Sequence, residues 1–469
     1  MVSRAGEERE VDAIIIGAGL TGLVAAYRLS KKGLRVAVLE QASRVGGQIQ
    51  THRSGGFVYE TGPNTGIISN LEIQKLFDEL GEDFIELAKP SAKRRLILRQ
   101  GRFSPLPSGA KSAVTTSLFT WRDKLRILLE PFRAKGTSPN ETIAQLVRRR
   151  LGQSYLTYAV DPFVGGIYAG DPSALVTRHA LPRLYALEQE YGSFIRGAIA
   201  KMRAHGQGVK PSKAVFSCLG GLDRLVERLA YLIGQEHIYL SAQGMDIAYR
   251  SAYRWETACC IEGTLHRFRS RVVISTVGSY ALRGCFSFLP ERELRSIESM
   301  RYAPIVQVAV GYRNAQGIEF DAFGGLIPSV EDGDVLGILN PTACFLGRAP
   351  EGGLLLSVFL GGLRSPQVIE RTDEEIGVLV RERLRTILGI ERQPDLLHIA
   401  RHQYAIPQYE ASTDDRLRAI EEIERSYRGL SLAGGIRDGI GMADRVAQAW
   451  YVTETLCREI ALEMTDKCS

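Results

Sequence analysis

Residues 11–40 read VDAIIIGAGLTGLVAAYRLSKKGLRVAVLE. The apolar, β-branched run at 11–16 predicts a buried strand, because strands covered on both faces lack polar alternation. Residues 21–32 have the apolar spacing of a helix, and Gly33 ends it. Residues 35–40 form a second apolar run. A strand, a helix and a strand within about 30 residues predict a parallel βαβ unit.

The turn between the first strand and the helix reads GAGLTG, residues 17–22. Its first glycine lets the chain turn, its second lets backbone reach a pyrophosphate, and its third lets the helix lie against the strand. Glu40 ends the second strand, where its carboxylate can accept ribose hydroxyls. The alternative is a glycine-rich turn without a ligand. The residues predicted to bind the dinucleotide here are Gly17, Gly19, Leu20, Thr21, Gly22, Glu40 and Gln41.

A second glycine motif, RVGGQIQT at residues 44–51, follows the acidic residue directly. Gly46 and Gly47 allow a second close approach of backbone to the same dinucleotide, and Arg44 can offset phosphate charge. Gln48 completes the predicted binding turn. A mobile nicotinamide must leave its site, whereas a resident flavin is enclosed, so we predict FAD.

The third motif, LSLAGGIRDGIGM at residues 430–442, again takes an apolar strand through glycines into a helix. A helix N-terminus aimed at the flavin would stabilise the negative charge that forms on reduction. The alternative is a plain strand–turn–helix. We expect the two ends of the chain to meet in one FAD-binding domain.

The composition is that of a globular protein, with 45% hydrophobic and 24% charged residues among 469. A net charge of +6 is too small by itself to imply nucleic acid. Seven cysteines, an odd number without a C-x-x-C pair, argue against a zinc site or a disulfide framework and fit a reducing cytosol. The acidic start argues against a secretory signal, and no run reaches the ~20 apolar residues of a membrane span. We therefore expect a cytoplasmic protein without a metal.

The pattern of strands and helices predicts an α/β fold with α+β elements and three folded units. A Rossmann-like FAD-binding domain is built from the discontinuous segments 1–88, 213–300 and 403–469. Residues 301–402 form a mostly antiparallel β-sheet substrate domain, since short apolar runs alternate there with Gly/Pro turns. Residues 89–212 form a helical insert domain, in which residues 89–154 hold 15 Lys/Arg against 3 Asp/Glu.

Three further segments carry a family resemblance: GPNT at 62–65, DPFVGGIYAGDP at 161–172 and AIPQY at 405–409. With the glycine motifs, they resemble the oxygen-dependent protoporphyrinogen oxidases, which are related to amine oxidases and phytoene desaturases. The similarity runs from about residue 11 to residue 456. Two positions depart from the family: Gly278 stands where proline is usual, and residues 443–445 read ADR where NDC is frequent.

The resemblance implies FAD-dependent, oxygen-consuming six-electron oxidation of protoporphyrinogen IX to protoporphyrin IX in heme biosynthesis, with release of hydrogen peroxide. Coproporphyrinogen III is the alternative substrate. An amine oxidase, a carotenoid desaturase and a non-catalytic FAD-binding protein are more distant alternatives. The implied partners are the porphyrinogen and molecular oxygen, without nucleic acid. A homodimer and a handover of product to a ferrochelatase remain open.

The resemblance also assigns residues. Gly170 offers its carbonyl to pyrrole N–H groups, and Arg94 pairs a substrate propionate, with Arg95 as the alternative. Leu326, Leu339 and Phe359 fall where the family sandwiches the macrocycle, although such residues are also typical of ordinary core. The remaining predicted FAD contacts are Gly62, Pro63, Asn64, Thr65, Met245, Gly435, Ile440, Gly441 and Met442.

The basic segment carries apolar residues as well as cations. Each cation near an anionic bilayer contributes about 1 kcal/mol, and apolar side chains add a shallow contact. We predict salt-sensitive, peripheral association with the cytoplasmic face of a membrane; the alternative is a solvated basic face. The apolar contacts predicted are Leu118, Phe119, Trp121, Leu125 and Phe132.

Overall fold

A five-stranded, wholly parallel sheet forms the centre of the first domain, which we call the parallel-sheet domain. The computed structural model describes residues 5–107, 109–203 and 210–466. The strands of this sheet come from distant parts of the chain, which confirms the predicted discontinuous domain. Their spatial order is β11 (Ile238–Tyr239), β3 (Val36–Leu39), β2 (Ala13–Ile16), β15 (Val272–Ser275) and β21 (Leu430–Leu432).

Side chains of this sheet alternate between two buried faces. Ala13 and Ile15 lie in one hydrophobic cluster, whereas Ile14 and Ile16 lie in another. Each fully buried aliphatic side chain contributes roughly 1.5–3 kcal/mol. Because both faces are covered, every position of β2 is apolar. This explains why the apolar run at residues 11–16 was enough to predict a buried strand.

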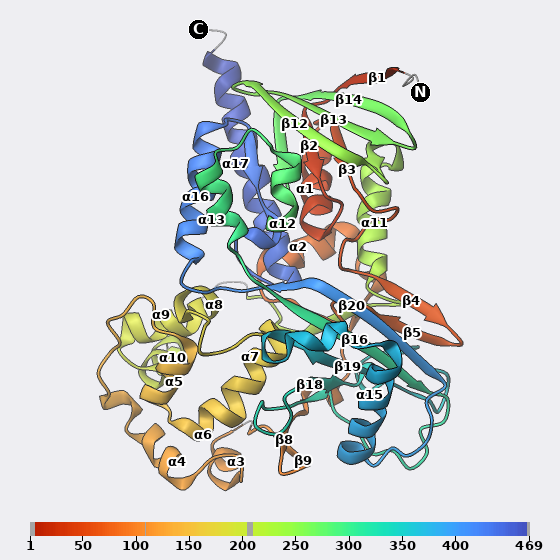
Figure 1. Cartoon of the computed structure of the whole chain (residues 1–469). Coiled ribbons are helices and arrows are strands. Elements are labelled where there is room, and N and C mark those ends of the chain that lie inside the picture. The colour runs from red at the N-terminus through yellow and green to blue at the C-terminus, as the bar shows by residue number, and fades with distance from the viewer. Residues whose placement is uncertain (1–4, 108, 204–209, 467–469) are drawn as a thin grey trace.

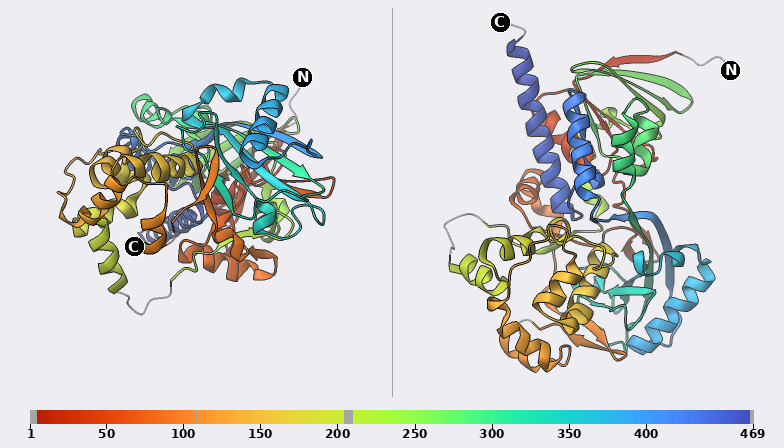
Figure 2. Two further views of the ribbon diagram at one scale, coloured as in Figure 1. Left: turned by 90° about the horizontal axis from the view of Figure 1, so that it is seen from below. Right: turned by 60° about the vertical axis from the view of Figure 1, so that its left-hand side comes forward.

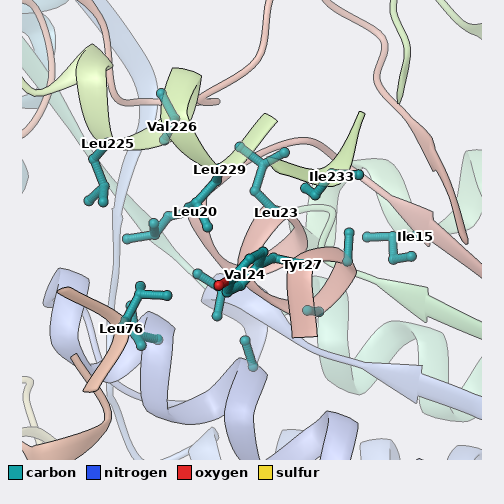
Figure 3. Close-up of a cluster of buried hydrophobic side chains, with 14 of the residues drawn as sticks. Ile15, Leu20, Leu23, Val24, Tyr27, Leu76, Leu225, Val226, Leu229 and Ile233 are labelled. Carbon is teal, nitrogen blue, oxygen red and sulfur yellow. The ribbon is translucent and has the colours of Figure 1, made fainter. Parts of the chain in front are cut away.

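Four helices cover the first face, and Figure 3 shows how α1 packs among them. Leu20 and Leu23 of α1 lie beside Leu229 of the neighbouring helix, and all three belong to one hydrophobic cluster. The C-terminal helix packs along α1 as well, so the two ends of the chain lie side by side. The four helices are α1 (Leu20–Lys31), α2 (Leu71–Leu80), α11 (Asp223–Ile233) and α17 (Met442–Asp466).

The second face is covered by α12 (Ser279–Cys285), α13 (Glu291–Glu298) and α16 (Thr413–Ser426), together with a four-stranded sheet. Three strands of that sheet follow one another directly in the chain. The fourth strand is the acidic segment near the N-terminus, which was not predicted as a strand. The spatial order is β1 (Ala5–Glu10), β14 (Thr264–Ser270), β13 (Arg254–Ile261) and β12 (Gln243–Ser251).

A seven-stranded, mainly antiparallel sheet forms the second domain, and α15 (Asp373–Leu388) packs on its outer face. Two of its strands, β16 and β20, run toward the parallel-sheet domain (Figure 1). The spatial order is β20 (Leu396–Pro407), β16 (Tyr302–Tyr312), β19 (Leu354–Gly361), β18 (Val335–Leu339), β17 (Gly324–Leu326), β8 (Arg95–Arg99) and β9 (Arg102–Pro105).

The strands β8 and β9 correct the predicted boundary at residue 89, which placed them in the helical insert. Gln100 and Gly101 both have positive φ angles, of 52° and 73°, the geometry of a tight hairpin turn. Leu98 is buried with the cluster beneath α15, and β8 pairs in parallel with β17. The helical domain therefore begins after this hairpin, because the apolar face of β8 is buried by the sheet.

The helical domain forms the third lobe, beside the seven-stranded sheet (Figure 2). Arg150 lies fully buried at its centre and pairs with Glu130 (2.5 Å) and Glu188 (2.6 Å). Some of the basic excess is therefore neutralised inside. The helices are α3 (Ala110–Thr115), α4 (Trp121–Leu128), α5 (Ile143–Arg150), α6 (Gln153–Tyr155), α7 (Asp161–Tyr168), α8 (Thr177–Ala180), α9 (Pro182–Tyr191) and α10 (Phe194–Arg203).

None of the helices in the described part of the chain combines the length and the apolar character that crossing a bilayer needs.

Smaller elements join the domains at the waist of the molecule. The small elements are β4 (Thr51–Ser54), β5 (Phe57–Glu60), β6 (Gly66–Ile67), β7 (Ile85–Leu87), β10 (Val215–Cys218) and α14 (Pro341–Cys344).

Candidate functional site

The first glycine loop lies at the carboxyl edge of the parallel sheet, where β2 passes into α1. Gly17 has φ +100°, and a Cβ there would lie 2.6 Å from Thr276 Oγ1. A Cβ at Gly22 would lie 2.0 Å from the Gly17 carbonyl oxygen. Both glycines are therefore required by packing. Thr276 was not predicted to contact this loop, since it follows a strand more than 250 residues away in the chain.

Gly19 differs from its two neighbours in the motif, because no protein atom lies within 4 Å of the place its Cβ would occupy. It precedes α1 and provides no side-chain cap for the helix N-terminus. Open space beside uncapped N–H groups and the positive end of a helix dipole fits the pyrophosphate of FAD. Leu20 and Thr21 are buried, so their predicted contact with the cofactor is through backbone.

The second glycine motif packs directly on the first. The Gly46 N–H donates to the Ala18 carbonyl (2.8 Å), and a Cβ at Gly47 would lie 3.2 Å from the Gly19 Cα. Both have positive φ, +103° and +57°. The structure thus brings the two motifs together, backbone against backbone, around the open space at Gly19.

The Arg44 side chain stabilises the turn formed by the second glycine motif. Its guanidinium donates to the carbonyl oxygens of Val45, Gly47 and Ile49 and to the side-chain oxygen of Gln50, at 2.8–3.1 Å. Burial lowers the pKa of Arg44, and the Glu40 carboxylate opposes that shift. The predicted role of its charge toward a phosphate remains a prediction, whereas its role in shaping the loop is visible.

Glu40 follows β3 and is fixed beside the first glycine loop. Its carboxylate accepts the N–H of Ala18 (2.6 Å) and of Ala42 (2.8 Å). The Gln243 side chain donates to the Gln41 carbonyl (3.0 Å), which places the start of β12 next to this corner. Met245 lies two residues further along β12, and its contact with FAD remains a prediction.

The segment of residues 62–65 joins the parallel-sheet domain to the seven-stranded sheet. A Cβ at Gly62 would lie 1.8 Å from the Gln48 carbonyl oxygen, so this glycine is required by close packing. Asn64 accepts a hydrogen bond from the Ser357 hydroxyl of β19 (2.8 Å). Pro63 lies between these two anchored residues, and Thr65 directly follows them.

The C-terminal glycine segment is held by side chains of α17. Gln448 accepts the Gly434 N–H (2.6 Å) and donates to Asp438 (2.7 Å). Arg445, a departure from the family pattern, donates to the carbonyls of Asp438 and Gly439. The departure therefore has a structural role: it closes the loop that precedes the helix.

The predicted flavin contacts in this segment lie at the start of α17. Met442 is buried, and its methyl group lies 2.7 Å from the place a Cβ of Gly66 would occupy. The Gly441 N–H donates to Asp444 (3.2 Å). Ile440 packs against the cluster of the helical domain, and Gly435 lies near Pro407 of β20. The segment thus touches all three domains.

The three residues predicted to sandwich the macrocycle share one face of the seven-stranded sheet, which we call the inner face. Leu326 pairs with Gly337, and Gly337 pairs with Phe359. Leu339 lies two residues from Gly337 and therefore points to the same side. Ser357 belongs to this face too, so the inner face looks toward residues 60–64 of the parallel-sheet domain.

The strand register separates the two candidate arginines. Arg95 pairs with Gly324, and Gly324 pairs with Leu339, so Arg95 lies on the inner face. Arg94 instead forms an exposed ion pair with Asp321 (3.2 Å) beside a hollow of about 630 Å³ that Leu339 does not line. The register places Arg95, the alternative residue, on the side of the predicted macrocycle contacts, because successive strand residues point to opposite faces. Which of the two arginines meets a propionate remains a prediction.

Gly170 follows the left-handed Ala169 at the end of α7. A Cβ at Gly170 would lie 2.4 Å from Gln408 Oε1. Gln408 is buried and donates to the carbonyls of Tyr168 (2.8 Å) and Ile406 (3.0 Å), thereby joining α7 to β20. Gln408 lies in the AIPQY segment that carried the family resemblance, but no role was predicted for its side chain. Glycine is needed here for packing as well as for the predicted approach of the ring.

Comparison with known proteins agrees with this geometry. Residues 20–441 match the family described as flavin containing amine oxidoreductase. The chain belongs to that family. The family is one of oxidoreductases that use a flavin, so this flavoprotein has FAD as its cofactor, and the glycine cradle described above fits it. The predicted fold class is confirmed.

Individual relatives of this flavin-dependent oxidoreductase span nearly its whole length. "Protoporphyrinogen oxidase 2, chloroplastic/mitochondrial" of Arabidopsis thaliana is 29% identical and covers 95% of both chains. "Coproporphyrinogen III oxidase" of Bacillus subtilis is 26% identical over 93% of this chain and 95% of its own. A crystal structure of a "Putative protoporphyrinogen oxidase" from Exiguobacterium sp. 255-15 has a TM-score of 0.80 at 24% identity, covering 97% of this chain and 100% of the other.

A pair of glycine variants tests the cradle. We expect Gly19→Val to fold but to be purified colourless, because its side chain fills the open space meant for the pyrophosphate. Gly22→Val should instead destabilise the fold itself, since its side chain collides with the Gly17 carbonyl. Flavin absorbance of the pure proteins and thermal unfolding of their apo forms measure both effects. Full yellow colour in Gly19→Val contradicts the assignment.

Proposed function

We propose that this protein oxidises protoporphyrinogen IX to protoporphyrin IX with FAD and molecular oxygen, releasing hydrogen peroxide, within heme biosynthesis. The observation that carries the proposal is the inner face, where Leu326, Leu339 and Phe359 lie together opposite the segment of residues 60–64. A large, mainly apolar macrocycle needs such a wall. The names of the relatives that span the whole chain support the same substrate class.

The chain's own residues would hold and orient the substrate. When bound, FAD supplies the hydride acceptor and the route to oxygen. The apolar side chains of the inner face would exclude water and hold the macrocycle against the cofactor. The Gly170 carbonyl, at the end of α7, would accept pyrrole N–H groups and so fix the rotation of the ring in its plane.

Cations on the inner face would meet the propionates at the rim of the macrocycle. Arg95 and Arg99 occupy alternate positions of β8, so both project to the side of Leu326. Arg99 lies over the Tyr158 ring (4.7 Å), and its buried Nη1 has no hydrogen-bond partner among the described residues. An arginine held this way is suited to pair a carboxylate.

Coproporphyrinogen III is the second candidate substrate, supported by relatives whose printed names give that activity. It carries two propionates where protoporphyrinogen carries vinyl groups, and each additional carboxylate needs a partner when it enters an apolar site. Relatives with that printed activity, from Bacillus subtilis and Propionibacterium freudenreichii, also cover 93% of this chain.

Anaerobic mixing of the holoenzyme with each porphyrinogen tests the proposal. We expect protoporphyrinogen IX to bleach the flavin absorbance, and admission of oxygen to restore it with the formation of hydrogen peroxide. Faster bleaching by coproporphyrinogen III would move the assignment to the alternative. A flavin that stays oxidised with both substrates contradicts the proposed function, while leaving the FAD site intact.

Arginine variants test the strand register. Arg95→Ala should raise KM roughly tenfold and change kcat little, because a propionate contact acts in the ground state and the transition state alike. Arg94→Ala is the matched control and should leave KM unchanged, since that side chain pairs with Asp321 on the other side. Steady-state kinetics on both variants decide; the reverse result would assign the propionate contact to Arg94.

We also propose that the helical domain binds the surface of an anionic membrane. Leu118 and Phe119 are buried, which corrects their prediction as membrane contacts. The exposed apolar patch instead covers α4 and the turn after it. It consists of Trp121, Leu125, Leu128, Leu129 and Phe132, with exposed fractions of 58–80%.

Basic side chains surround this apolar patch. Lys124 lies over the Trp121 ring (4.4 Å), and Arg196 of α10 lies over the Phe132 ring (5.8 Å). Apolar residues rimmed by cations are the composition of a surface that inserts shallowly between anionic headgroups. A poorly soluble substrate makes delivery from a bilayer physically reasonable.

Vesicle sedimentation tests this surface. We expect the holoenzyme to pellet with phosphatidylglycerol vesicles at low salt and to be released at high salt, because salt screens the cations. Trp121→Ser with Phe132→Ser should remove most of the binding. Tyr231→Ser, a change of an equally exposed aromatic residue on α11, should have no effect. Failure to pellet at low salt contradicts the proposal.

A further inference from the structure

Two exposed tyrosines from different domains stack on each other at the waist of the molecule. Tyr280 lies in α12 of the parallel-sheet domain, and Tyr404 lies in β20 of the seven-stranded sheet. Their ring centroids are 4.0 Å apart and their planes differ by 15°. They remain 55% and 47% exposed, so general burial in the core does not explain the pairing.

A third ring supports the pair. Tyr302, at the start of β16, meets both rings edge-on at 5.6 Å. Its hydroxyl accepts the N–H of Ser279, the first residue of α12 (3.1 Å). The beginning of α12 is thus fixed to the two strands that run between the domains.

The stack depends on a glycine that departs from the family pattern. A Cβ at Gly278 would lie 2.3 Å from Cε1 of Tyr280, closer than real contacts allow. Any residue with a side chain here, proline included, would push the Tyr280 ring from its place.

Backbone next to the stacked pair contacts the predicted FAD site. Gln48, next to the second glycine pair, donates to the carbonyl oxygens of Tyr404 and Ala405, both at 3.2 Å. Thr276, four residues before Tyr280, packs on the first glycine loop. Burial, the neighbouring Tyr302 and Tyr404 phenols and, last, the Glu40 carboxylate raise the pKa of Tyr280.

We propose that Tyr280 and Tyr404 form an aromatic clasp across the edge of the dinucleotide site, which slows the release of FAD. The clasp joins α12 to β20 beside the cofactor. Release of an extended dinucleotide requires these two elements to separate, and separation breaks the stack. Loss of the stack should therefore speed dissociation more than it weakens the fold. This inference needs only FAD binding, so it stands or falls independently of the substrate.

Dissociation of FAD from the holoenzyme tests the clasp. After dilution, free flavin is collected by filtration at successive times. Tyr280→Ala and Tyr404→Ala should each release FAD roughly three- to tenfold faster, the range expected for one aromatic pair. The double variant should be no faster than either single one, because both lose the same contact. Gly278→Ala should reproduce the effect without removing either ring.

Two control variants separate stacking from general damage. Tyr404→Phe keeps the ring and should release FAD at the original rate. Tyr451→Ala removes a tyrosine that is 66% exposed on α17 and should also change nothing. Unchanged release in both alanine variants overturns the clasp, as does equal acceleration in Tyr451→Ala. Slower release in the alanine variants would mean that the stack obstructs the cofactor, which also overturns it.

Discussion

Close contact between two glycine loops is the constraint on which the rest of this molecule depends. Gly46 and Gly47 lie against Ala18 and Gly19 at van der Waals distance, and no side chain fits between the two loops. Parallel strands all end at the same edge of their sheet, so this contact forms at the edge that receives the cofactor. The space left open at Gly19 is the one place in the first motif that packing does not fill.

The cofactor edge is also where the domains interlock. Glu60, two residues before Gly62, forms a buried ion pair with Arg348 of the loop before β19 (3.1 Å). Gln307 of β16 donates to the Glu60 carbonyl (2.8 Å). A buried pair whose partner is removed leaves an uncompensated charge at a cost of about 3–5 kcal/mol. These contacts hold the seven-stranded sheet, and with it the inner face, against residues 60–64 of the parallel-sheet domain.

The positions that depart from the family pattern have structural roles. Arg445 closes the C-terminal glycine loop through two backbone carbonyls, and Gly278 makes room for the Tyr280 ring. Both lie next to the dinucleotide site rather than in it. A family fold can therefore keep the same cofactor chemistry while individual chains change how tightly the surrounding loops are held.

Local pattern was enough to predict the βαβ unit and the glycine motifs, because each depends on side-chain periodicity and turn residues close in sequence. The hairpin β8–β9 was missed, since its apolar side chains are buried by strands more than 200 residues away. The face of Arg95, the contact of Thr276 with Gly17 and the pairing of Tyr280 with Tyr404 were beyond sequence reasoning for the same reason. Motifs close in sequence were enough to predict a flavin; only the tertiary register, which sets the direction of each strand side chain, decided which residues lie on the inner face.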